Sequence, residues 1–114
     1  GGYDMLGQAF GGTISVTGPS PDAPPSKVGF SITDVTTGLM GAMGILAALL
    51  YRNKTGEGQR IDVDLLRTSI EFASYFITNF TFDGVVPKPK GTKYHSLSPY
   101  QAYKAKDEIF RIFN

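Results

Sequence analysis

Asp34 is the residue whose type and position suggest chemistry most directly. It stands between a hydrophobic stretch, residues 27–33, and a long apolar, glycine-rich segment, residues 35–51. The spacing alone favours an N-cap, whose carboxylate accepts the free amides of the first helical turn. A carboxylate held there can also act as a nucleophile, because aspartates form covalent acyl intermediates. Both interpretations stay open, since the two carboxylate oxygens can serve one purpose each.

Other sets of reactive residues are missing from the sequence. There is no cysteine and His95 is the single histidine, so neither a thiolate site nor a His-rich metal site can form. The sequence contains no nucleophile elbow, phosphate-binding loop or dinucleotide fingerprint. Lys and Arg number 11 against 10 Asp and Glu, which is not the basic excess of a nucleic-acid-binding protein. We therefore expect neither a metal nor nucleic acid as a partner.

The apolar pattern predicts mainly helices with short strands between them. Among the 114 residues, 41% are hydrophobic and 18% charged, as in a globular domain. Residues 3–15 predict a helix weakened by glycines, and residues 27–33 predict an extended stretch. Residues 35–51 are apolar on all sides, which predicts a buried helix ending at Gly56.

The long apolar helix carries two further signals. Gly38, Gly41 and Gly44 recur every three residues and leave a smooth strip, which another stretch of backbone can approach closely. The longest nearly charge-free run, residues 39–51, is shorter than the roughly 20 residues that span a bilayer. No signal peptide pattern is visible at the N-terminus. We expect a cytoplasmic protein with no membrane partner.

The second half of the chain predicts a strand, a helix, a long loop and a hairpin. Strict alternation over residues 60–64 predicts a short strand with one buried face. Asp64 then caps a helix over residues 65–80. A basic, Pro-rich loop and two alternating strands complete the chain, over residues 85–99, 100–103 and 108–113.

Several blocks, in a fixed order, resemble the family III CoA-transferases and cover nearly the whole chain. They are Gly2-Tyr3-Asp4 with Gln8-Ala9, Thr17-Gly18 with Pro24-Pro25, Ile32 to Leu39, Gly44 to Leu49, Lys54 to Gln59, and Gly91-Thr92 with Ser98 to Asp107. The resemblance implies an α/β fold, with a Rossmann-like large domain built on a parallel sheet and a smaller second domain. It also implies a homodimer of two interlocked subunits.

Within that family the chain corresponds to a middle segment. We expect residues 1–82 to be the late part of the large domain, with the nucleophile helix. Residues 83–114 would be the linker loop and the first hairpin of the small domain, and a change of composition near residue 82 marks the boundary. Most positions that contact CoA in the family lie upstream of this segment. We therefore expect the isolated segment to be inactive.

The resemblance also implies a role for Asp34, and four other residues are candidates that each have a structural alternative. The family's nucleophilic aspartate falls on Asp34, which would pass CoA from an acyl-CoA to a carboxylic acid through a covalent aspartyl intermediate. Acyl-CoA is then a substrate, and no cofactor is bound permanently. Tyr3 and Gln8 would line the CoA site, or else pack the first helix. Lys93 would contact the acid or be a surface charge. His95 would contact the acid, or else be solvated or structure its loop. The last block looks closest to members that act on succinyl-CoA and short dicarboxylates.

Two other functions stay open. The α-methylacyl-CoA racemase branch of the family uses a His-Asp pair, with the His just before the residue that matches Asp4. Tyr3 stands at that position, and a phenol is a weak base near neutral pH, so CoA transfer is favoured. A non-catalytic helical interaction module is the alternative from a different class. It predicts an exposed apolar face on the glycine-lined helix.

Overall fold

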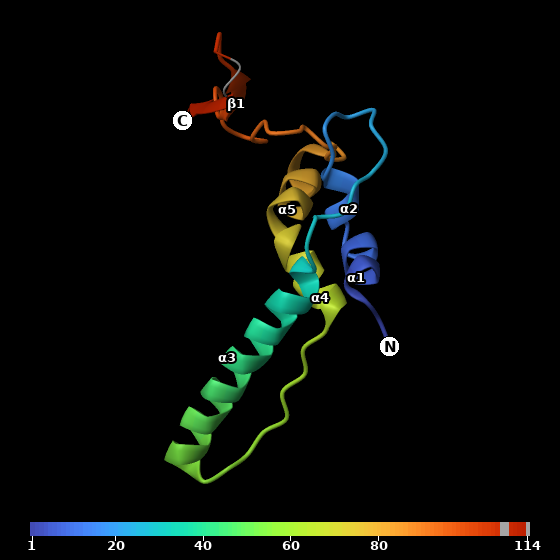
Figure 1. The fold of residues 1–114 in the computed structure, drawn as a ribbon. Helices are drawn as coiled ribbons and strands as arrows, with labels where there is room; N and C mark the ends of the chain where they lie inside the picture. Colours follow the sequence, from blue (N-terminus) through green and yellow to red (C-terminus); the bar gives the residue numbers. More distant parts are fainter. Residues whose placement is uncertain (108–109, 114) are drawn as a thin grey trace.

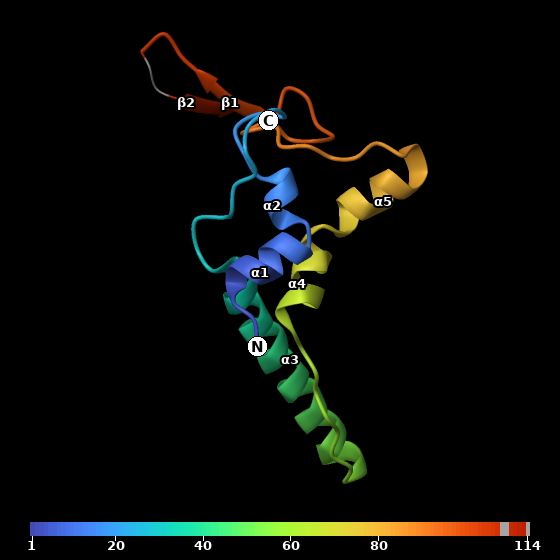
Figure 2. The same cartoon turned by 90° about the vertical axis from the view of Figure 1, so that its right-hand side faces the viewer.

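The computed structural model of the protein describes residues 1–107 and 110–113. These residues form five helices and a two-stranded hairpin, joined by loops (Figure 1). In chain order they are α1 (Asp4–Phe10), α2 (Thr13–Val16), α3 (Ile32–Thr55), α4 (Leu65–Phe72), α5 (Ser74–Asp83), β1 (Gln101–Lys104) and β2 (Phe110–Phe113). α1 and α4 pack together, and α3 contacts both. The Cα radius of gyration is 18.4 Å, whereas a compact domain of similar length has about 13 Å. The molecule is elongated because α3 projects away from the other helices (Figure 2).

The helix predicted over residues 3–15 is two helices. α1 ends at Phe10 and α2 begins at Thr13, because Gly12 adopts a left-handed conformation with φ 84°. Gly11 lies directly against Ser69 of α4, where an added Cβ would overlap the serine side chain. The glycines that weaken this helix therefore let α1 and α4 approach closely.

α3 is longer than the sequence pattern predicts. It spans Ile32–Thr55 and takes in the last two residues of the predicted extended stretch 27–33, the rest of which forms no strand. Ser31 occupies the N-cap position, and Gly56, with φ 81°, ends the helix as predicted. The prediction that Asp34 is the N-cap is wrong, because Asp34 lies inside the first turn of the helix.

The glycine strip of α3 faces the side chains of an extended segment. Gly41 lies against Val63, and a Cβ on Gly44 would come within 2.8 Å of Ile61 Cγ2. Gly38 faces open space, since a Cβ there would meet nothing within 4 Å. Two of the three glycines thus provide the close approach that their spacing predicts.

The segment after α3 runs back along that helix in an extended form (Figure 1). The strand predicted over residues 60–64 is wrong, since this segment pairs with no strand among the described residues. Asp64 is the N-cap of the next helix, as predicted, and accepts a hydrogen bond from Arg67 N at 2.8 Å. The helix predicted over residues 65–80 is divided at Ala73 into α4 and α5.

The loop and the hairpin at the end of the chain are confirmed. Residues 85–100 form neither helix nor strand. β1 and β2 are antiparallel, with Gln101 opposite Phe113 and Lys104 opposite Phe110. Residues 108 and 109 of the predicted second strand lie outside the described residues. The described part is helix-rich with one antiparallel hairpin, consistent with a fragment of an α/β protein, and the Rossmann-like sheet stays a prediction.

The packed centre of the molecule is polar. Ala73 and Pro89 are the buried apolar side chains among residues 1–107. The buried polar residues gather where α1, α2, α3 and α4 meet, and they are Asp4, Gln8, Thr13, Thr33, Thr68 and Ser69. The large apolar side chains of α3 are exposed in this chain; Leu46, for example, is 61% exposed. The burial predicted for this helix is therefore not provided by the chain itself.

α3 is the one described helix that is long and apolar enough to cross a membrane, judged by length and composition. Its apolar 18-residue window has a mean hydropathy of 1.5, and 6% of that window is buried. The helix is longer than the run 39–51 on which the prediction of no membrane partner rests. Core helices of soluble proteins also meet this criterion, and the prediction stays a prediction.

Asp4 is the centre of the polar cluster. Its Oδ1 accepts hydrogen bonds from Thr33 N at 2.9 Å and from Thr33 Oγ1 at 2.7 Å, and its Oδ2 accepts one from Gln8 Nε2 at 2.7 Å. Gln8 Oε1 accepts a hydrogen bond from Val28 N at 2.9 Å. Burial raises the pKa of Asp4, but hydrogen bonds from Thr33, Gln8 and the backbone amide of Asp34 outweigh it and hold the pKa below its ordinary value of 3.8. An ionised carboxylate therefore joins α1 to the first turn of α3.

The close contact of α1 with α4 predicts that Gly11→Ala destabilises the full-length protein. The added Cβ has to displace Ser69, which is held by a hydrogen bond between its Oγ and Thr13 Oγ1 at 2.8 Å. We expect a loss of about 1–3 kcal/mol of unfolding free energy, measured by chemical denaturation. Gly29→Ala is the matched control, because a Cβ there meets nothing within 4 Å. Equal effects of the two substitutions would contradict the packing argument.

The lowered pKa of Asp4 predicts a loss of stability in acid. The ionised side chain is favoured in the folded state, so its stabilising contribution is complete above the ordinary pKa of 3.8 and is lost as the pH falls through the lower folded-state pKa. Asp4→Asn should remove this part of the pH dependence. It should also cost roughly 1–3 kcal/mol at neutral pH, because an amide faces Gln8 Nε2. Urea unfolding at a series of pH values tests this prediction. It would be refuted if the free energy of unfolding changed with pH in the same way for the unchanged protein and for Asp4→Asn.

Candidate active site

Asp34 lies in the first turn of α3, where that helix contacts α1 and α4. Its side chain is exposed, and its carboxylate accepts no hydrogen bond within the described residues. One turn further on, Gly38 has no side chain and open space around it, so the region beside the carboxylate is not filled. A negative charge in the first turn is also favoured by the helix dipole. The backbone of Asp34 is thus fixed on a helix, while its carboxylate is exposed and accepts no hydrogen bond within the described residues.

The carboxylate of Asp34 is free because a different residue binds the amides at the start of α3. Asp4 accepts hydrogen bonds from the amide and the hydroxyl of Thr33, the second residue of α3. In the next turn, Thr37 Oγ1 donates to Thr68 Oγ1 of α4 at 3.0 Å. The start of α3 is therefore held by α1 and α4 through contacts that do not involve the side chain of Asp34.

A groove of about 470 Å³ opens between α1 and the start of α4. Its lining includes Leu6, Phe10, Thr37, Asp64 and Leu65. Asp64 is the one charged side chain in this lining, and it is committed to capping α4. No described side chain in this lining is therefore a cation that could bind a phosphate or carboxylate group.

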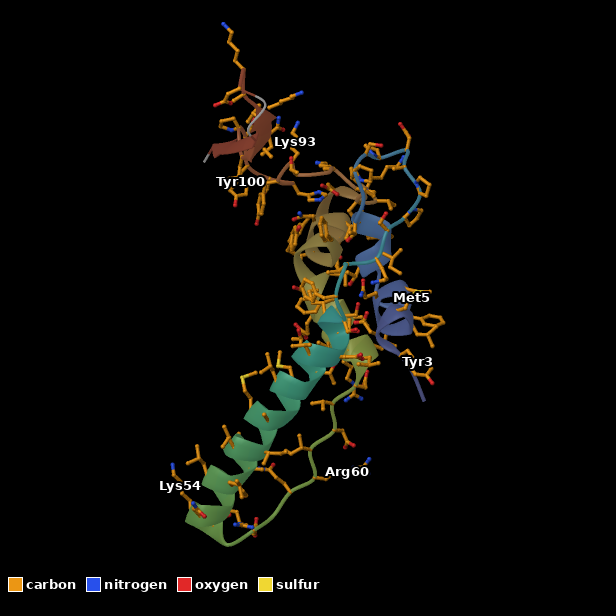
Figure 3. The ribbon with its side chains drawn as sticks, viewed as in Figure 1. Tyr3, Met5, Lys54, Arg60, Lys93 and Tyr100 are labelled. Atoms are coloured by element: carbon orange, nitrogen blue, oxygen red, sulfur yellow. The ribbon has the colours of Figure 1, made fainter. Side chains whose placement is uncertain are left out.

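Tyr3 and Gln8, the two residues predicted to line the CoA site, have opposite environments. Tyr3 precedes α1 and is 82% exposed, near the N-terminus (Figure 3). Gln8 is 0% exposed, and both ends of its amide are hydrogen-bonded inside the chain. Gln8 therefore packs the first helix in this structure, and its side chain exposes no surface to a ligand. A contact between Tyr3 and CoA stays a prediction.

Lys93 and His95 are not brought to Asp34 by this chain. Lys93 lies near the hairpin, far from α3 (Figure 3). His95 packs edge-on against Phe76 of α5, with ring centroids 4.5 Å apart. Burial, followed by the charge of Lys90, lowers the pKa of His95 below its ordinary value of 6.5, which favours the neutral imidazole at neutral pH. Their predicted contact with the acid would have to occur at this other end of the molecule.

The link between Asp4 and Thr33 is not predicted by the local sequence pattern. One signal was available, since Asp4 and Gln8 are four residues apart and so share a face of a helix. Their partner lies 29 residues further along the chain. A contact of that range cannot be inferred from the local pattern of one sequence.

The chain is similar to curated CoA-transferases over most of its length. The model of CoA-transferase family III matches residues 1–113. Succinyl-CoA:mesaconate CoA-transferase of Haloarcula hispanica is 36% identical over 105 residues, which cover 92% of this chain and 26% of the relative. Succinyl-CoA:glutarate CoA-transferase of Mus musculus is 38% identical over 106 residues, which cover 93% of this chain and 24% of the relative.

A solved structure shows the same fold. The crystal structure of a CAIB/BAIF family protein from Brucella suis matches this chain with a TM-score of 0.81 and 34% identity, covering 94% of this chain and 28% of that one. The chain thus spans about a quarter of the length of the relatives it matches. Because the family match extends over nearly every residue, the chain belongs to CoA-transferase family III.

Proposed function

We propose that the protein transfers coenzyme A from an acyl-CoA to a carboxylic acid, with Asp34 as the nucleophile. The observation that carries this proposal is the exposed, unbonded carboxylate of Asp34 on the first turn of a helix whose amides are held by Asp4. Family membership supports CoA transfer. The relatives named for succinyl-CoA support succinyl-CoA, or another short acyl-CoA, as the donor.

The reaction proceeds through two kinds of acyl intermediate. A carboxylate oxygen of Asp34 attacks the thioester carbonyl carbon, the C–S bond breaks, and CoA thiolate leaves a mixed anhydride behind. The thiolate then attacks the aspartyl carbonyl carbon, which releases the donor acid as a carboxylate and forms an aspartyl-CoA thioester. The acceptor carboxylate attacks that thioester, the C–S bond breaks, and CoA thiolate leaves a second anhydride behind. The thiolate finally attacks the acceptor carbonyl, which forms the new acyl-CoA and frees Asp34.

The position of Asp34 suits these steps. In each of these reaction steps the nucleophile is an anion and the leaving group departs as an anion, so no general acid or base is required. The N-terminal end of α3 carries a partial positive charge, which stabilises the negative charge of the tetrahedral intermediates. The rigid attachment of the first turn also reduces the entropy lost when the carboxylate meets the thioester.

We also infer the surroundings of this site in the full-length protein. Residues 1–82 belong to a large domain and residues 83–114 begin a smaller one, within an interlocked homodimer in the cytoplasm. The exposed apolar surface of α3 supports its burial by other segments or by a second subunit. Acyl-CoA and the acid are substrates, and no permanently bound cofactor is required.

The racemase alternative finds less support in this chain. It requires a base at position 3 that takes a proton from the carbon next to the thioester. Tyr3 places a phenol there, and a phenol is poorly suited to that step near neutral pH. The exposed carboxylate of Asp34, in contrast, needs no such partner for nucleophilic attack.

The nucleophile can be trapped in the full-length protein. Incubation with succinyl-CoA followed by hydroxylamine should convert Asp34 to a hydroxamate, detected by mass spectrometry of the peptide. Asp34→Asn should abolish the trapped product and lower kcat by about 1,000-fold or more, since an amide cannot form the anhydride.

Asp62→Asn provides the matched control for this experiment. Asp62 is an exposed carboxylate that pairs with Arg60 at 2.7 Å, and an exposed pair of this kind contributes little to stability. This variant should keep both the trapped hydroxamate and the rate. Full activity of Asp34→Asn would exclude Asp34 as the nucleophile.

A further inference from the structure

We propose that Asp4 is a positioning residue for CoA transfer, because its hydrogen bonds to Thr33 fix the start of α3 and so orient the carboxylate of Asp34. The inference rests on the proposed function. It adds to that function a residue of α1 that contacts neither CoA nor the acid.

The link between the two helices is short and fully bonded. The side chain of Thr33 is 0% exposed, and its amide and its hydroxyl both donate to the same oxygen of Asp4. The hydroxyl also lies 3.2 Å from the backbone oxygen of Asp4. The other carboxylate oxygen is held by Gln8. The carboxylate of Asp4 therefore cannot rotate without breaking a hydrogen bond in a buried site.

Thr33 is bonded to Asp34 through a single peptide group, so its position determines where the nucleophile begins. The amide of that peptide group also faces the carboxylate of Asp4. Ser31, at the N-cap position, contributes no side-chain hydrogen bond to the helix. Asp4 is therefore the side chain that secures this turn.

Because the carboxylate that bonds to the start of α3 comes from Asp4 of α1, the carboxylate of Asp34 does not have to accept these hydrogen bonds. An aspartate that caps its own helix accepts hydrogen bonds from the first-turn amides, which occupies its oxygens and turns the side chain back along the helix. In this structure the buried carboxylate accepts those bonds and the exposed one does not. The two tasks that the spacing assigns to one residue are thus divided between Asp4 and Asp34.

The close approach of α1 makes this division possible. A Cβ on Gly7 would come within 3.0 Å of Thr33 Oγ1 and of Leu65 Cβ. Gly7 thus lets the backbone of α1 reach the start of α3 and α4 together. The contact is specific to this turn, because the remainder of α3 projects beyond α1 (Figure 2).

Single-turnover trapping in the full-length protein tests the proposal. Asp4→Asn and Thr33→Val should each slow hydroxamate formation at Asp34 by roughly 10- to 100-fold, because the nucleophile is no longer held in line with the thioester. The KM for succinyl-CoA should change by less than about threefold, since neither residue contacts CoA. Thr33→Ser keeps the hydroxyl and should restore most of the rate. All variants are assayed at a temperature at which circular dichroism shows them folded.

Asp83→Asn is the matched control, because Asp83 is also a carboxylate that accepts a backbone amide hydrogen bond, from Val85 N at 2.8 Å, but it lies at the C-terminal end of α5, which carries no reacting group. It should leave the trapping rate unchanged. A raised KM at unchanged kcat for Thr33→Val, or equal rates for the Val and Ser variants, would overturn the positioning role. If Asp4→Asn does not fold, the comparison of Thr33→Val with Thr33→Ser tests the positioning role by itself.

Asp34→Asn, run in parallel, separates the two proposals. Hydroxamate formation that persists without Asp34 overturns the proposed function itself. Loss of trapping in Asp34→Asn together with unchanged rates in Asp4→Asn and Thr33→Val leaves the proposed function standing and overturns the positioning role alone.

Discussion

The hydrogen bonds between the carboxylate of Asp4 and Thr33 determine how the first turn of α3 is placed. They join two segments that lie 29 residues apart, and they are buried at the junction of the helices. A buried ionised group is costly unless its hydrogen bonds are complete. Asp4 meets that condition because Thr33 and Gln8 donate to both of its oxygens. The exposed carboxylate of Asp34 follows from this arrangement.

The polar centre and the glycines depend on each other. Short polar side chains can bridge helices only when the backbones lie close together, and Gly7 and Gly11 bring α1 against Thr33 and Ser69. Larger residues at these positions would separate the helices and lengthen the hydrogen bonds. The small and polar composition of this junction therefore provides accurate placement, whereas most of the apolar surface lies elsewhere.

Most large apolar side chains of α3 are exposed in this chain. The apolar surface of α3 extends well beyond α1 and α4, and among the described residues its outer half lies along the extended segment that returns beside it (Figure 1). The chain covers about a quarter of its relatives' length, and the described residues do not bury this helix. The polar junction, in contrast, satisfies its own hydrogen bonds and is formed by the chain itself.

The sequence by itself determined the family, the helical character of most segments, the cap at Asp64, the stop at Gly56 and the candidate nucleophile, because each of these depends on residue types at short range. It did not determine the break at Gly12, the division at Ala73 or the unpaired segment 60–64. Those depend on which neighbours a segment meets. Tertiary structure alone decided that Asp4 binds the amides at the start of α3 while Asp34 stays free. Spacing shows that a helix needs a cap, whereas only the packing of α1 against α3 shows which carboxylate supplies it.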